Sequence, residues 1–526
     1  MNEQIIKRLD KSSSVKETSI MRMAIAFLFM VAVFIWSYFF HEDVANNTFL
    51  IIGAVFGAYM AMNIGANDVA NNVGPAVGSK AMTLFWAIVI AAIFESAGAI
   101  IAGGEVVKTI KKGIIDPTMF ENPEIFIWAM TSALLAAAVW LNFSTYAGTP
   151  VSTTHSIVGG VMGAGIAASG FAIVSWGTMA KIAASWIISP VLGAAIAAGF
   201  LYTIKTKIVY KDNMVESAKK VVPYLVAIMA WSFSTYIILK GLKKIIKLDF
   251  MAAGSIGLAI AVITFFLVTP LIARVANKLE NSRASVNTLF TIPLIFAAAL
   301  LSFAHGANDV ANAIGPLAAI ADAVQTGEIS SNAGIPLWVM LIGALGISLG
   351  LALFGPKLIR TVGSEITELD QMRAFSIAMA ASITVIIASQ LGLPVSSTHI
   401  AVGGVIGVGF LREWLDRGES AFIAETKEKL RAEKKELSSY KDELKVLKAK
   451  ESKSAEELER MLKLLKLIEK QEDDVKKEKK DIKAAKKVQY VKRDAIKKII
   501  AAWIITVPAA ALLSAAIFFM IKGYMS

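Results

Sequence analysis

The sequence predicts an all-α polytopic membrane protein with two inverted-topology repeats and broken helices at the midplane, plus an inserted cytoplasmic antiparallel coiled-coil hairpin. Three observations predict this fold class. Apolar stretches of roughly 17–25 residues, long enough to cross a bilayer, recur along the chain. Two long motifs each occur twice, and a strongly charged segment interrupts the apolar pattern near the carboxyl end.

The composition excludes a water-soluble protein. Hydrophobic residues make up 56% of the 526 residues and charged residues only 18%. The segment Arg412–Lys498 alone holds 27 Lys or Arg and 20 Asp or Glu residues, so the rest has too few charges for a soluble surface. The absence of cysteine excludes disulfides and thiolate chemistry. The net charge of +12 lies mostly in this mixed-sign segment and in short loops, which indicates membrane topology and no nucleic-acid partner.

Eleven apolar stretches are predicted to span the bilayer. They lie near residues 23–40, 48–64, 82–102, 124–147, 176–203, 221–240, 249–271, 288–304, 337–355, 372–391 and 496–521. Two shorter glycine-rich pieces, 156–170 and 396–411, are expected to be half-helices or hairpins. The first stretch follows a basic segment and precedes no small-residue cleavage site, so a retained anchor is predicted rather than a signal peptide.

Three segments of the chain recur. Residues 63–75 return as 304–316 at an offset of 241, and residues 150–155 return as 394–399 at an offset of 244. Residues 181–189 resemble 498–506 at an offset of 317, so 73 additional residues lie within the second copy. The predicted domains are an amino-terminal segment with an extra transmembrane helix (1–47), membrane repeat 1 (48–203), a linker with two transmembrane helices (204–287), the first part of membrane repeat 2 (288–411), a charged helical hairpin (412–494) and the final transmembrane helix of repeat 2 (495–526).

The additional residues are predicted to form two antiparallel coiled-coil helices. Leu430, Leu437 and Leu444 recur every seven residues. Ser454 and Glu457 then have the spacing of a capping box at the start of a new helix. A second apolar stripe is expected at Leu458, Met461, Leu465, Ile468, Val475 and Ile482. The hairpin is either a solvated spacer or an arm that docks a partner or regulates the membrane part.

The charges of the loops predict the orientation of the chain. With the basic amino terminus inside, the loops 204–220 and 272–287 and the charged hairpin are cytoplasmic, and the carboxyl terminus is outside. The loop 240–247, with four lysines, disagrees because it falls outside. On this count the first copy starts outside and the second inside. Inverted repeats of this kind are typical of secondary transporters, whose site lies near the midplane between the repeats.

Each copy of the first motif places an aspartate, Asp68 or Asp309, in an apolar segment, at a cost of about 2.5–3.5 kcal/mol on insertion scales. Each aspartate has an asparagine directly before it and another three residues after it. These asparagines are Asn67, Asn71, Asn308 and Asn312. Nearby glycines, with Pro75 and Pro316, are expected to break the helix and expose backbone carbonyls. Hard oxygen ligands of this kind suit Na⁺; the alternative is that the polar side chains only cap broken helices.

The second motif is a candidate anion site. Pro150 and Pro394 suit the first turn of a helix, and hydroxyl side chains follow each of them directly. These are Ser152, Thr153, Thr154, Ser396, Ser397 and Thr398. A helix start offers unpaired N–H groups and the positive end of the helix dipole. Two such starts that face each other could hold a tetrahedral oxyanion; the alternative is that the hydroxyls only cap their helices.

Glu95 and His305 are candidates for a coupling role. Glu95 is an intramembrane carboxylate with no counterpart in the second half of the chain. Three of the four histidines, His155, His305 and His399, lie in the repeated motifs. We expect them to be packed and hydrogen-bonded, with proton coupling as the alternative.

The paired motifs, Gly-Ala-Asn-Asp-Val-Ala-Asn and Pro-Val-Ser-(Ser/Thr)-Thr-His, resemble those of the inorganic phosphate transporter (PiT) family over about residues 50–411 and 493–521. That family takes up phosphate with Na⁺, or with H⁺ in some branches. By this resemblance, Asn67, Asp68, Asn308 and Asp309 correspond to cation- and substrate-site positions, and the six hydroxyl residues to phosphate-contacting positions. Glu95 and His305 match positions that matter in the animal branch, but the second glutamate of that branch falls on Ala378. The amino-terminal span and the hairpin lie outside the usual pattern.

The predicted function is that of a secondary active transporter, not an enzyme, that imports inorganic phosphate by symport with Na⁺. No cofactor is expected apart from Na⁺ as the coupling ion, held by the two aspartates and the four asparagines. Phosphate is assigned to the six hydroxyls together with Asp68 and Asp309. The alternatives are H⁺-coupled phosphate symport, sulfate symport, or a phosphate sensor that signals through the hairpin.

The predicted location is the cell (inner) membrane, with many crossings and the hairpin on the cytoplasmic side. The predicted partners are inorganic phosphate and the lipid bilayer, and a homodimer and a cytoplasmic protein partner for the hairpin are left open. An intramembrane aspartyl protease is disfavoured because an asparagine precedes each aspartate in place of the Gly-x-Gly-Asp pattern. The sequence also lacks a His-Glu-x-x-His zinc motif.

Overall fold

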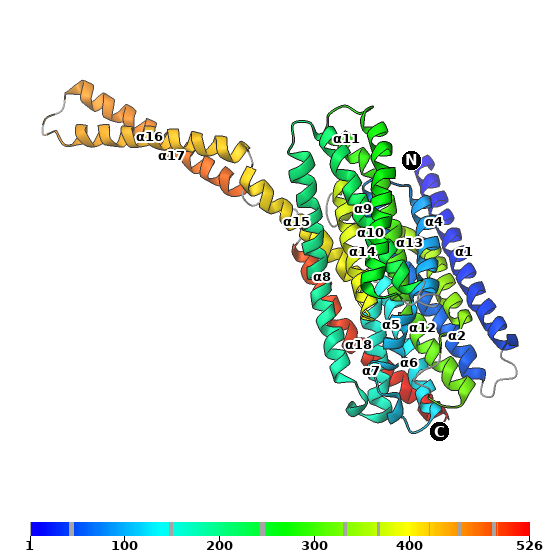
Figure 1. Ribbon diagram of the computed structural model, residues 1–526. Coiled ribbons are helices and arrows are strands. Elements are labelled where there is room, and N and C mark those ends of the chain that lie inside the picture. Colours follow the sequence, from blue (N-terminus) through cyan, green and yellow to red (C-terminus); the bar gives the residue numbers. More distant parts are fainter. Residues whose placement is uncertain are drawn as a thin grey trace. The chain divides into compact units, whose positions relative to one another are not determined.

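The computed structural model describes residues 2–40, 47–146, 151–241, 248–329, 334–365, 369–419, 421–450, 452, 454–485, 491 and 493–525. Within these residues the chain is helical, with a single isolated β-bridge between Ile115 and Val174 (Figure 1). Eleven of the described helices are long and apolar enough to cross a membrane. The all-α, multi-pass class that the sequence predicts is therefore confirmed.

The bounds of the helices, in chain order, are α1 Asn2–Phe40, α2 Asn47–Asn67, α3 Val69–Gly78, α4 Leu84–Ala102, α5 Gly104–Lys112, η1 Pro117–Met119, α6 Pro123–Tyr146, α7 Thr153–Ser169, η2 Phe171–Ile173, α8 Trp176–Ile204, η3 Lys205–Val209, α9 Met214–Lys240, α10 Phe250–Ala276, α11 Arg283–Leu289, α12 Thr291–Thr326, α13 Leu337–Glu365, α14 Gln371–Gln390, α15 Ser397–Glu419, α16 Ala421–Lys448, α17 Ala455–Ala485 and α18 Arg493–Met525.

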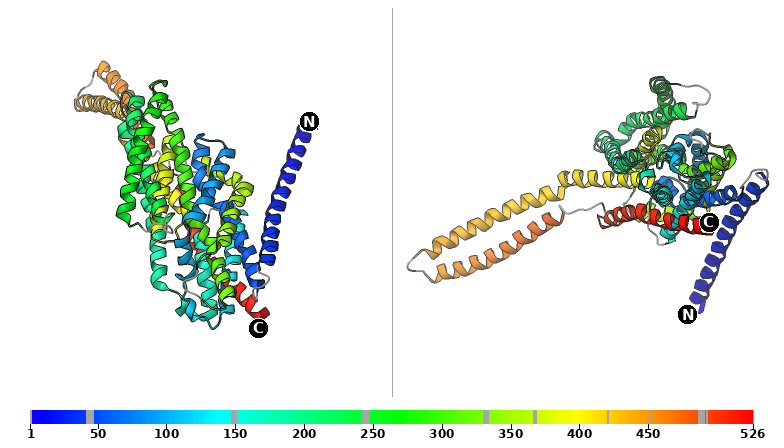
Figure 2. Two further views of the ribbon diagram at one scale, coloured as in Figure 1. Left: turned by 45° about the vertical axis from the view of Figure 1, so that its right-hand side comes forward. Right: turned by 90° about the horizontal axis from the view of Figure 1, so that it is seen from below.

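The chain divides into two compact units. The first consists of Met1–Val408 together with Arg493–Ser526, and the second of Gly409–Lys492. In the first unit the long helices lie side by side, with α1 at the edge against α2 and α13 (Figure 2). The first described residues of α1 and the last described residues of α18 lie at opposite ends of this bundle (Figure 1).

The helices at the two aspartate motifs differ from the expectation. In the first copy the helix is interrupted only at Asp68, between α2 and α3, and α3 continues through Pro75. In the second copy the expected break is wrong, because α12 runs without interruption through Asp309 and Pro316. Each proline lacks an N–H group, so it still leaves the carbonyl four residues earlier without its helical donor. Those carbonyls belong to Asn71 and Asn312.

The two glycine-rich pieces begin at the hydroxyl motifs. Helix α7 has 17 residues, which corresponds to a rise of about 25 Å, short of the roughly 30 Å of a hydrocarbon core. It packs along α6. The residues after α7 bond with those before α6, since Asp116 N donates to Ile173 O at 2.8 Å and Ser175 N to Ile114 O at 2.9 Å. Helices α6 and α7 therefore form a hairpin that starts and ends at the same end of the bundle.

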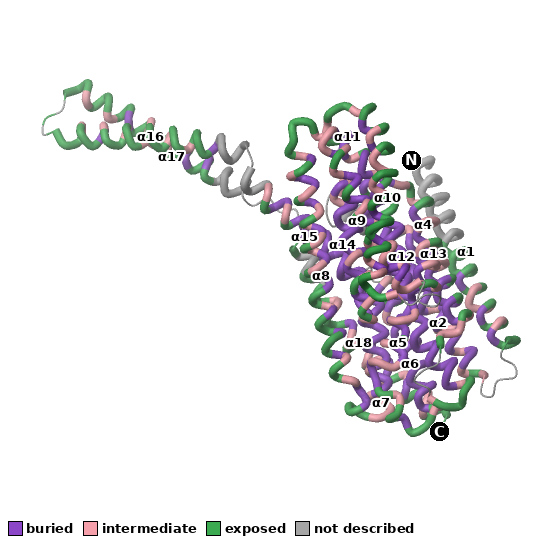
Figure 3. The backbone as a smooth tube through the Cα atoms, viewed as in Figure 1, coloured by how far each residue is buried: buried purple, intermediate pink, exposed green. Residues whose placement is uncertain are grey.

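Glycines allow the central helices to approach one another closely. A Cβ on Gly65 of α2 would overlap the carbonyl oxygen of Ile347 on α13, and one on Gly306 of α12 would overlap that of Glu95 on α4. The same holds between α7 and α18 and between α15 and α8. In the 18-residue apolar window of α12, 89% of the residues are buried, whereas 17% are buried in that of α10 (Figure 3). Helix α12 is therefore the core of the unit, and the outer helices present apolar side chains to lipid.

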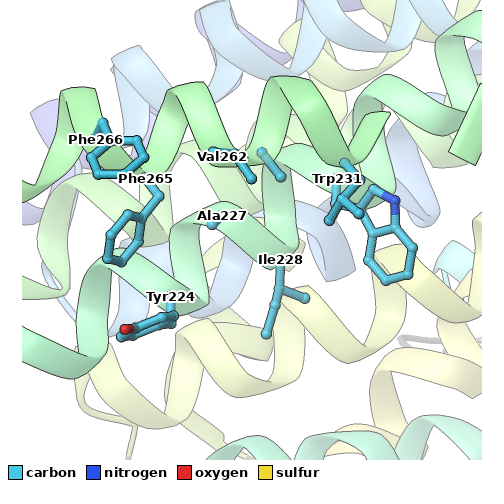
Figure 4. A pocket seen from close by; sticks show the side chains of 9 residues that line it. Tyr224, Ala227, Ile228, Trp231, Val262, Phe265 and Phe266 are labelled. Carbon is cyan, nitrogen blue, oxygen red and sulfur yellow. The ribbon is translucent and has the colours of Figure 1, made fainter. Parts of the chain in front are cut away.

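Helices α9 and α10 pair with each other at the periphery. An apolar cavity of about 380 Å³ lies between them, lined among others by Tyr224, Trp231 and Phe265 (Figure 4). None of the described residues that line it is charged. This cavity is separate from the polar centre described below.

The second unit contains α16 and α17. The cross-links between them run in opposite directions along the two helices: Arg460 bonds Glu443 at 2.8 and 3.1 Å, and Lys429 pairs with Glu478 at 2.8 Å. The capping box is confirmed, because Ser454 N donates to Glu457 Oε2 at 3.0 Å and Glu457 N to Ser454 Oγ at 3.2 Å.

In the apolar stripe expected on α16, Leu444 is buried and Leu430 and Leu437 are half-buried. The stripe expected on α17 is wrong in part. Leu458 is 51% and Leu465 44% exposed, whereas Leu464 is fully buried. The face of α17 that packs against α16 therefore includes Leu464 rather than Leu465. Because α17 has few apolar residues, the heptad pattern does not distinguish between these two neighbouring positions.

Candidate functional site

The two aspartates are buried at the centre of the first unit, with Asp68 1% and Asp309 0% exposed. Asp68 follows α2 and keeps a helical hydrogen bond from its N–H to Ile64 O at 2.9 Å. Asp309 projects from the unbroken α12. An isolated carboxylate in such a place is costly unless polar groups or a cation compensate it. The surrounding side chains supply such polar groups.

The hydroxyls of the second motif point at these carboxylates. Thr153 Oγ1 donates to Asp68 Oδ2 at 2.6 Å, and Thr398 Oγ1 donates to Asp68 Oδ1 at 3.1 Å. Ser397 Oγ donates to Asp309 Oδ2 at 3.0 Å. The predicted cation and anion motifs of both copies therefore meet in one buried cluster, because α7 and α15 start beside the aspartates.

The asparagines after each aspartate join the two copies. Asn71 Nδ2 donates to Thr398 Oγ1 at 2.8 Å. Asn312 Nδ2 donates to Thr153 Oγ1 at 3.2 Å and to Thr154 Oγ1 at 3.1 Å. Each asparagine thus bonds the hydroxyl motif of the other half of the chain, which places the cluster between the two halves.

The asparagines before each aspartate have other neighbours. Asn67 Nδ2 donates to Thr145 Oγ1 of α6 at 2.8 Å. Asn308 Nδ2 donates to Ser389 Oγ at 2.9 Å and to Leu393 O at 3.2 Å, and its Oδ1 accepts a bond from Val395 N at 3.3 Å. In this conformation Asn308 holds the chain that leads into the second hydroxyl motif.

The remaining hydroxyls stabilise the helix starts. Ser152 Oγ accepts a bond from His155 N at 3.1 Å, and Ser396 Oγ accepts one from His399 N at 3.3 Å. Thr154 Oγ1 donates to Val395 O at 2.9 Å. Both serines are N-terminal caps in the ordinary sense. Pro150, which was expected to open the first of these helices, lies outside the described residues.

Glu95 is not isolated. Its Oε2 lies 2.6 Å from His305 Nδ1, and its Oε1 accepts a bond from Asn72 Nδ2 at 2.7 Å. On the other side of the ring, His305 Nε2 lies 2.8 Å from Asp309 Oδ2. A continuous polar chain therefore runs from Asn72 through Glu95 and His305 to Asp309, and all its members are buried.

Asn72 was missed by the sequence reasoning. Its counterpart at an offset of 241 is Ala313, just as Ile64 stands where His305 would be expected in the first copy. The three residues around Glu95 are thus all unmatched between the copies. The lack of a counterpart for Asn72, Glu95 and His305 could have indicated that these residues act together. Their contact is visible only in the folded chain.

The other two motif histidines pack against each other. The rings of His155 and His399 lie 4.5 Å apart, and each contacts a tryptophan, Trp186 or Trp503. They border an apolar cavity of about 930 Å³. Packing was expected, but neither ring nitrogen of His399 has a hydrogen-bond partner among the described residues. These two rings do not contact the aspartates through any described bond.

The cluster contains ligands that suit a hard cation. One atom each of Asp68, His305 and Asp309 lie within 4.8 Å of one another. Asp309 Oδ1 and Asn312 Oδ1 are buried and accept no hydrogen bond from the part of the chain that the structure describes. Buried oxygens without donors are uncommon, and carboxylate and amide oxygens are the ligands that such a cation prefers. The donor set therefore fits Na⁺.

Comparisons with known proteins agree on one family. The model of the phosphate transporter family matches residues 64–514. A "Putative phosphate permease" of Helicobacter pylori is 49% identical over 518 residues, which cover 98% of this chain and 97% of that protein. A permease of the same name from Haemophilus influenzae is 40% identical over 369 residues, covering 69% of this chain and 87% of its own. A solved structure titled "The sodium-dependent phosphate transporter" matches with a TM-score of 0.72 and 32% identity, over 90% of this chain and 99% of that one.

Proposed function

The chain belongs to the phosphate transporter family, and we propose that it imports inorganic phosphate by symport with Na⁺. The observation that carries this proposal is the buried cluster in which two aspartates meet two hydroxyl-bearing helix starts. Family membership also excludes the enzyme alternative, since the family and its structural neighbour are transporters.

Electrostatics gives the proposed order of events. Among the described residues, the cluster holds three carboxylates, Asp68, Asp309 and Glu95, and only one group, His305, that could carry a positive charge. A phosphate dianion that entered this cluster alone would be repelled strongly in a low-dielectric surrounding. Cations must therefore bind first, at the two aspartates and at the oxygens of Asn312 and its counterpart Asn71. The name of the structural neighbour supports Na⁺ as that cation.

Phosphate is proposed to bind at the starts of α7 and α15. Thr153, Thr154, Ser397 and Thr398 bring hydroxyl groups to the boundary of the two halves, next to the unpaired N–H groups of the first helical turns. The hydroxyls that now donate to the aspartates would be released when cations neutralise those carboxylates, and they would then donate to the phosphate oxygens. Substrate and cation sites are thereby linked through the same side chains.

The polar chain Glu95–His305–Asp309 is proposed to set the coupling. His305 lies 2.6 Å from Glu95 and 2.8 Å from Asp309. A change of charge at Asp309 therefore alters the strength of the bond between His305 and Glu95. The same chain is the observation that favours the second candidate, H⁺-coupled symport, in which a proton would take the place of one Na⁺.

Exchanged contacts support the inverted repeat. Asn71 bonds Thr398, and its counterpart Asn312 bonds Thr154, the counterpart of Thr398. Gly65 and Gly306 contact Ile347 and Glu95, which are again related by a constant offset of 252. Ser96 and Ser348, at the same offset, bond each other at 2.8 Å. A two-fold relation between two halves produces contacts of this kind, and inverted repeats around a central site are typical of secondary transporters.

The proposed arrangement in the membrane follows the loop charges. The lysine-rich residues 205–213 and the α16–α17 unit are placed in the cytoplasm, and residues 113–122 and 170–175 outside. We propose the cell (inner) membrane as the location and the domain limits given by the sequence repeats. The antiparallel helices α16 and α17 are proposed to form a short coiled coil that is solvated on its outer faces.

Binding experiments on the purified protein test the proposal. Radiolabelled phosphate should bind in Na⁺ and not when choline replaces Na⁺ at fixed pH, and unlabelled sulfate should compete poorly. Efficient competition by sulfate would favour the alternative anion. Phosphate binding without any net flux would favour the sensor alternative, and deletion of residues 412–494 would then remove a downstream response.

A further inference from the structure

Helix α5 covers the part of α12 that follows the aspartate motif. It continues α4 after a turn at Gly103, and it buries Val106, Val107, Ile110 and Lys111. Ile110 packs on Gly315, where an added Cβ would lie 2.7 Å from Ile110 Cγ2. Gly315 is one turn beyond Asn312. Helix α5 therefore closes one end of the polar cluster.

A buried ion pair fastens the far end of α5 to α12. Lys111 Nζ lies 2.8 Å from Asp322 Oδ2, and both side chains are 7% exposed. Such a pair is an inefficient way to stabilise a fixed contact, because the cost of removing both charges from water offsets most of their attraction. It separates readily, however, when water reaches both groups. The pair thus suits a contact that forms and breaks.

A hydrogen bond ties α5 to the second hydroxyl motif. Thr109 Oγ1 donates to Gly392 O at 2.7 Å. Gly392 has a φ of +67° and precedes Leu393 and Val395, which Asn308 bonds on their other side. The loop that leads to the proposed phosphate residues is therefore held between α5 and the aspartate helix, so movement of α5 is transmitted to both.

The chain holds a second, weaker copy of this arm. Residues 107–110, Val-Lys-Thr-Ile, return as 359–362, Ile-Arg-Thr-Val, at the offset of 252 that relates Ser96 to Ser348. The ion pair does not return. Gly363 stands at the position of Lys111, and Ala81, at an offset of 241, stands at that of Asp322. In an inverted repeat the two arms would serve opposite faces of the membrane, and only the first has residues that can form this Lys–Asp pair.

Two lysines lie on either side of Glu105 of α5. Lys108 is 62% exposed and lies 4.0 Å from Glu105, and Lys240, at the end of α9 with a side chain that is 7% exposed, lies 4.0 Å from the same carboxylate. Lys240 begins the lysine-rich loop that disagreed with the positive-inside count. A cluster of positive charge beside the entrance of an anion path raises the local concentration of the anion. Lys108 supplies such a charge on the exposed side of α5.

We propose that α5 is the outer gate of the transport path, held closed by the Lys111–Asp322 ion pair and by the Thr109–Gly392 hydrogen bond. This inference rests on the proposed transport function. The gate opens by rotation at Gly104, where the nearest atom to an added Cβ is 3.9 Å away, whereas Gly103 packs against Val310 and stays fixed on α12. Because the opposite arm has no counterparts of Lys111 and Asp322, the closed state of the outer face is favoured in the absence of ligands.

Thiol accessibility tests the gate directly, because the chain has no cysteine. Ala319 is 1% exposed and lies between Gly315 and Asp322 on the same face of α12, beneath α5. Ala319→Cys should react slowly with a membrane-impermeant thiosulfonate added to intact cells. Adding Lys111→Ala should raise that rate about tenfold or more, since removal of one partner destabilises a buried pair strongly. Thr109→Val, which removes only one hydrogen bond, should raise it about threefold.

Charge exchange is the matched control. Lys111→Asp with Asp322→Lys should restore the slow reaction, whereas Lys219→Ala, which breaks a partly exposed ion pair with Glu216 at the start of α9, should leave it unchanged. If both Lys111→Ala and Thr109→Val left the rate within twofold of the parent, α5 would not be a gate. The thiol reaction needs neither Na⁺ nor phosphate, so this outcome is distinct from a failure of Na⁺-driven uptake.

Discussion

Asp68→Asn is the substitution that tests the cation site most sharply. Asparagine keeps the size of the side chain and one of its two oxygens but removes the charge. In the parent, Asp68 accepts hydroxyl bonds from Thr153 at 2.6 Å and from Thr398 at 3.1 Å. Those two hydroxyls still find one acceptor after the substitution. The principal loss is therefore the attraction between the carboxylate and a bound cation.

The size of that loss can be estimated. Two unit charges about 4 Å apart attract by roughly 4 kcal/mol at the effective dielectric of about 20 that describes protein sites. Part of this is recovered because Asp309 no longer has a second carboxylate near it. We expect a net loss of about 3 kcal/mol, which corresponds to a rise of about a hundredfold in the Na⁺ concentration for half-maximal uptake.

The assay is a Na⁺ titration of phosphate uptake into proteoliposomes. Asp249→Asn is the matched control, because Asp249 caps α10 by accepting a bond from Ala252 N at 2.8 Å and asparagine caps a helix equally well. The control should follow the parent curve. If Asp68→Asn shifted the half-maximal Na⁺ concentration by less than threefold, the carboxylate would not be a cation ligand.

Three further substitutions have expected outcomes. Gly306→Ala should abolish uptake, because its Cβ would overlap the Glu95 carbonyl and displace α4 from His305; Gly254→Ala, with open space around it, should not change uptake. Glu95→Gln should lower uptake about tenfold through loss of a charge-assisted bond to His305, with normal yield of folded protein in size-exclusion chromatography. Burial, followed by the nearby Glu478, raises the pKa of Glu433 on α16. The folded hairpin then binds protons more readily than the unfolded chain, so its stability falls as the pH rises through that raised pKa. Glu433→Gln should increase hydrogen-exchange protection of α16 and α17 at pH 7 and reduce its dependence on pH; equal protection in both proteins would contradict this.

The spans and the two motifs could be predicted because they depend on local properties. Hydropathy over some twenty residues identifies a crossing wherever it lies in the fold. Duplication identified Asp68 and Asp309 as a pair, and in the structure both accept hydrogen bonds from the hydroxyl motifs, Asp68 from Thr153 and Thr398 and Asp309 from Ser397. Repetition along the sequence therefore carried information about proximity in space.

The continuity of α12 could not be read from the sequence. Gly315 and Pro316 are helix-breaking residues in water, yet α12 is enclosed by other helices and keeps its course. Dense packing on all sides compensates for poor local propensity. In the first copy the same residue types accompany an interruption at Asp68, so local composition does not decide between the two outcomes.

The partners of individual polar groups were also beyond the sequence. Glu95 and Asn72 are 23 residues apart and His305 is a further 210 residues from Glu95, and their contact depends on how α3, α4 and α12 pack. The Lys111–Asp322 pair is likewise separated by 211 residues. Charge pairing over such distances needs the tertiary structure.

The measurement that tests the central claim most directly is phosphate uptake into proteoliposomes of the purified chain, with an inward Na⁺ gradient and the pH clamped. We predict accumulation of radiolabelled phosphate above its external concentration, lost when choline replaces Na⁺. Uptake that does not depend on Na⁺ but is driven by an acid-outside pH gradient would contradict Na⁺ coupling. It would assign the coupling of proton and phosphate transport to Glu95 and His305. Absence of phosphate uptake under both gradients would contradict phosphate symport itself.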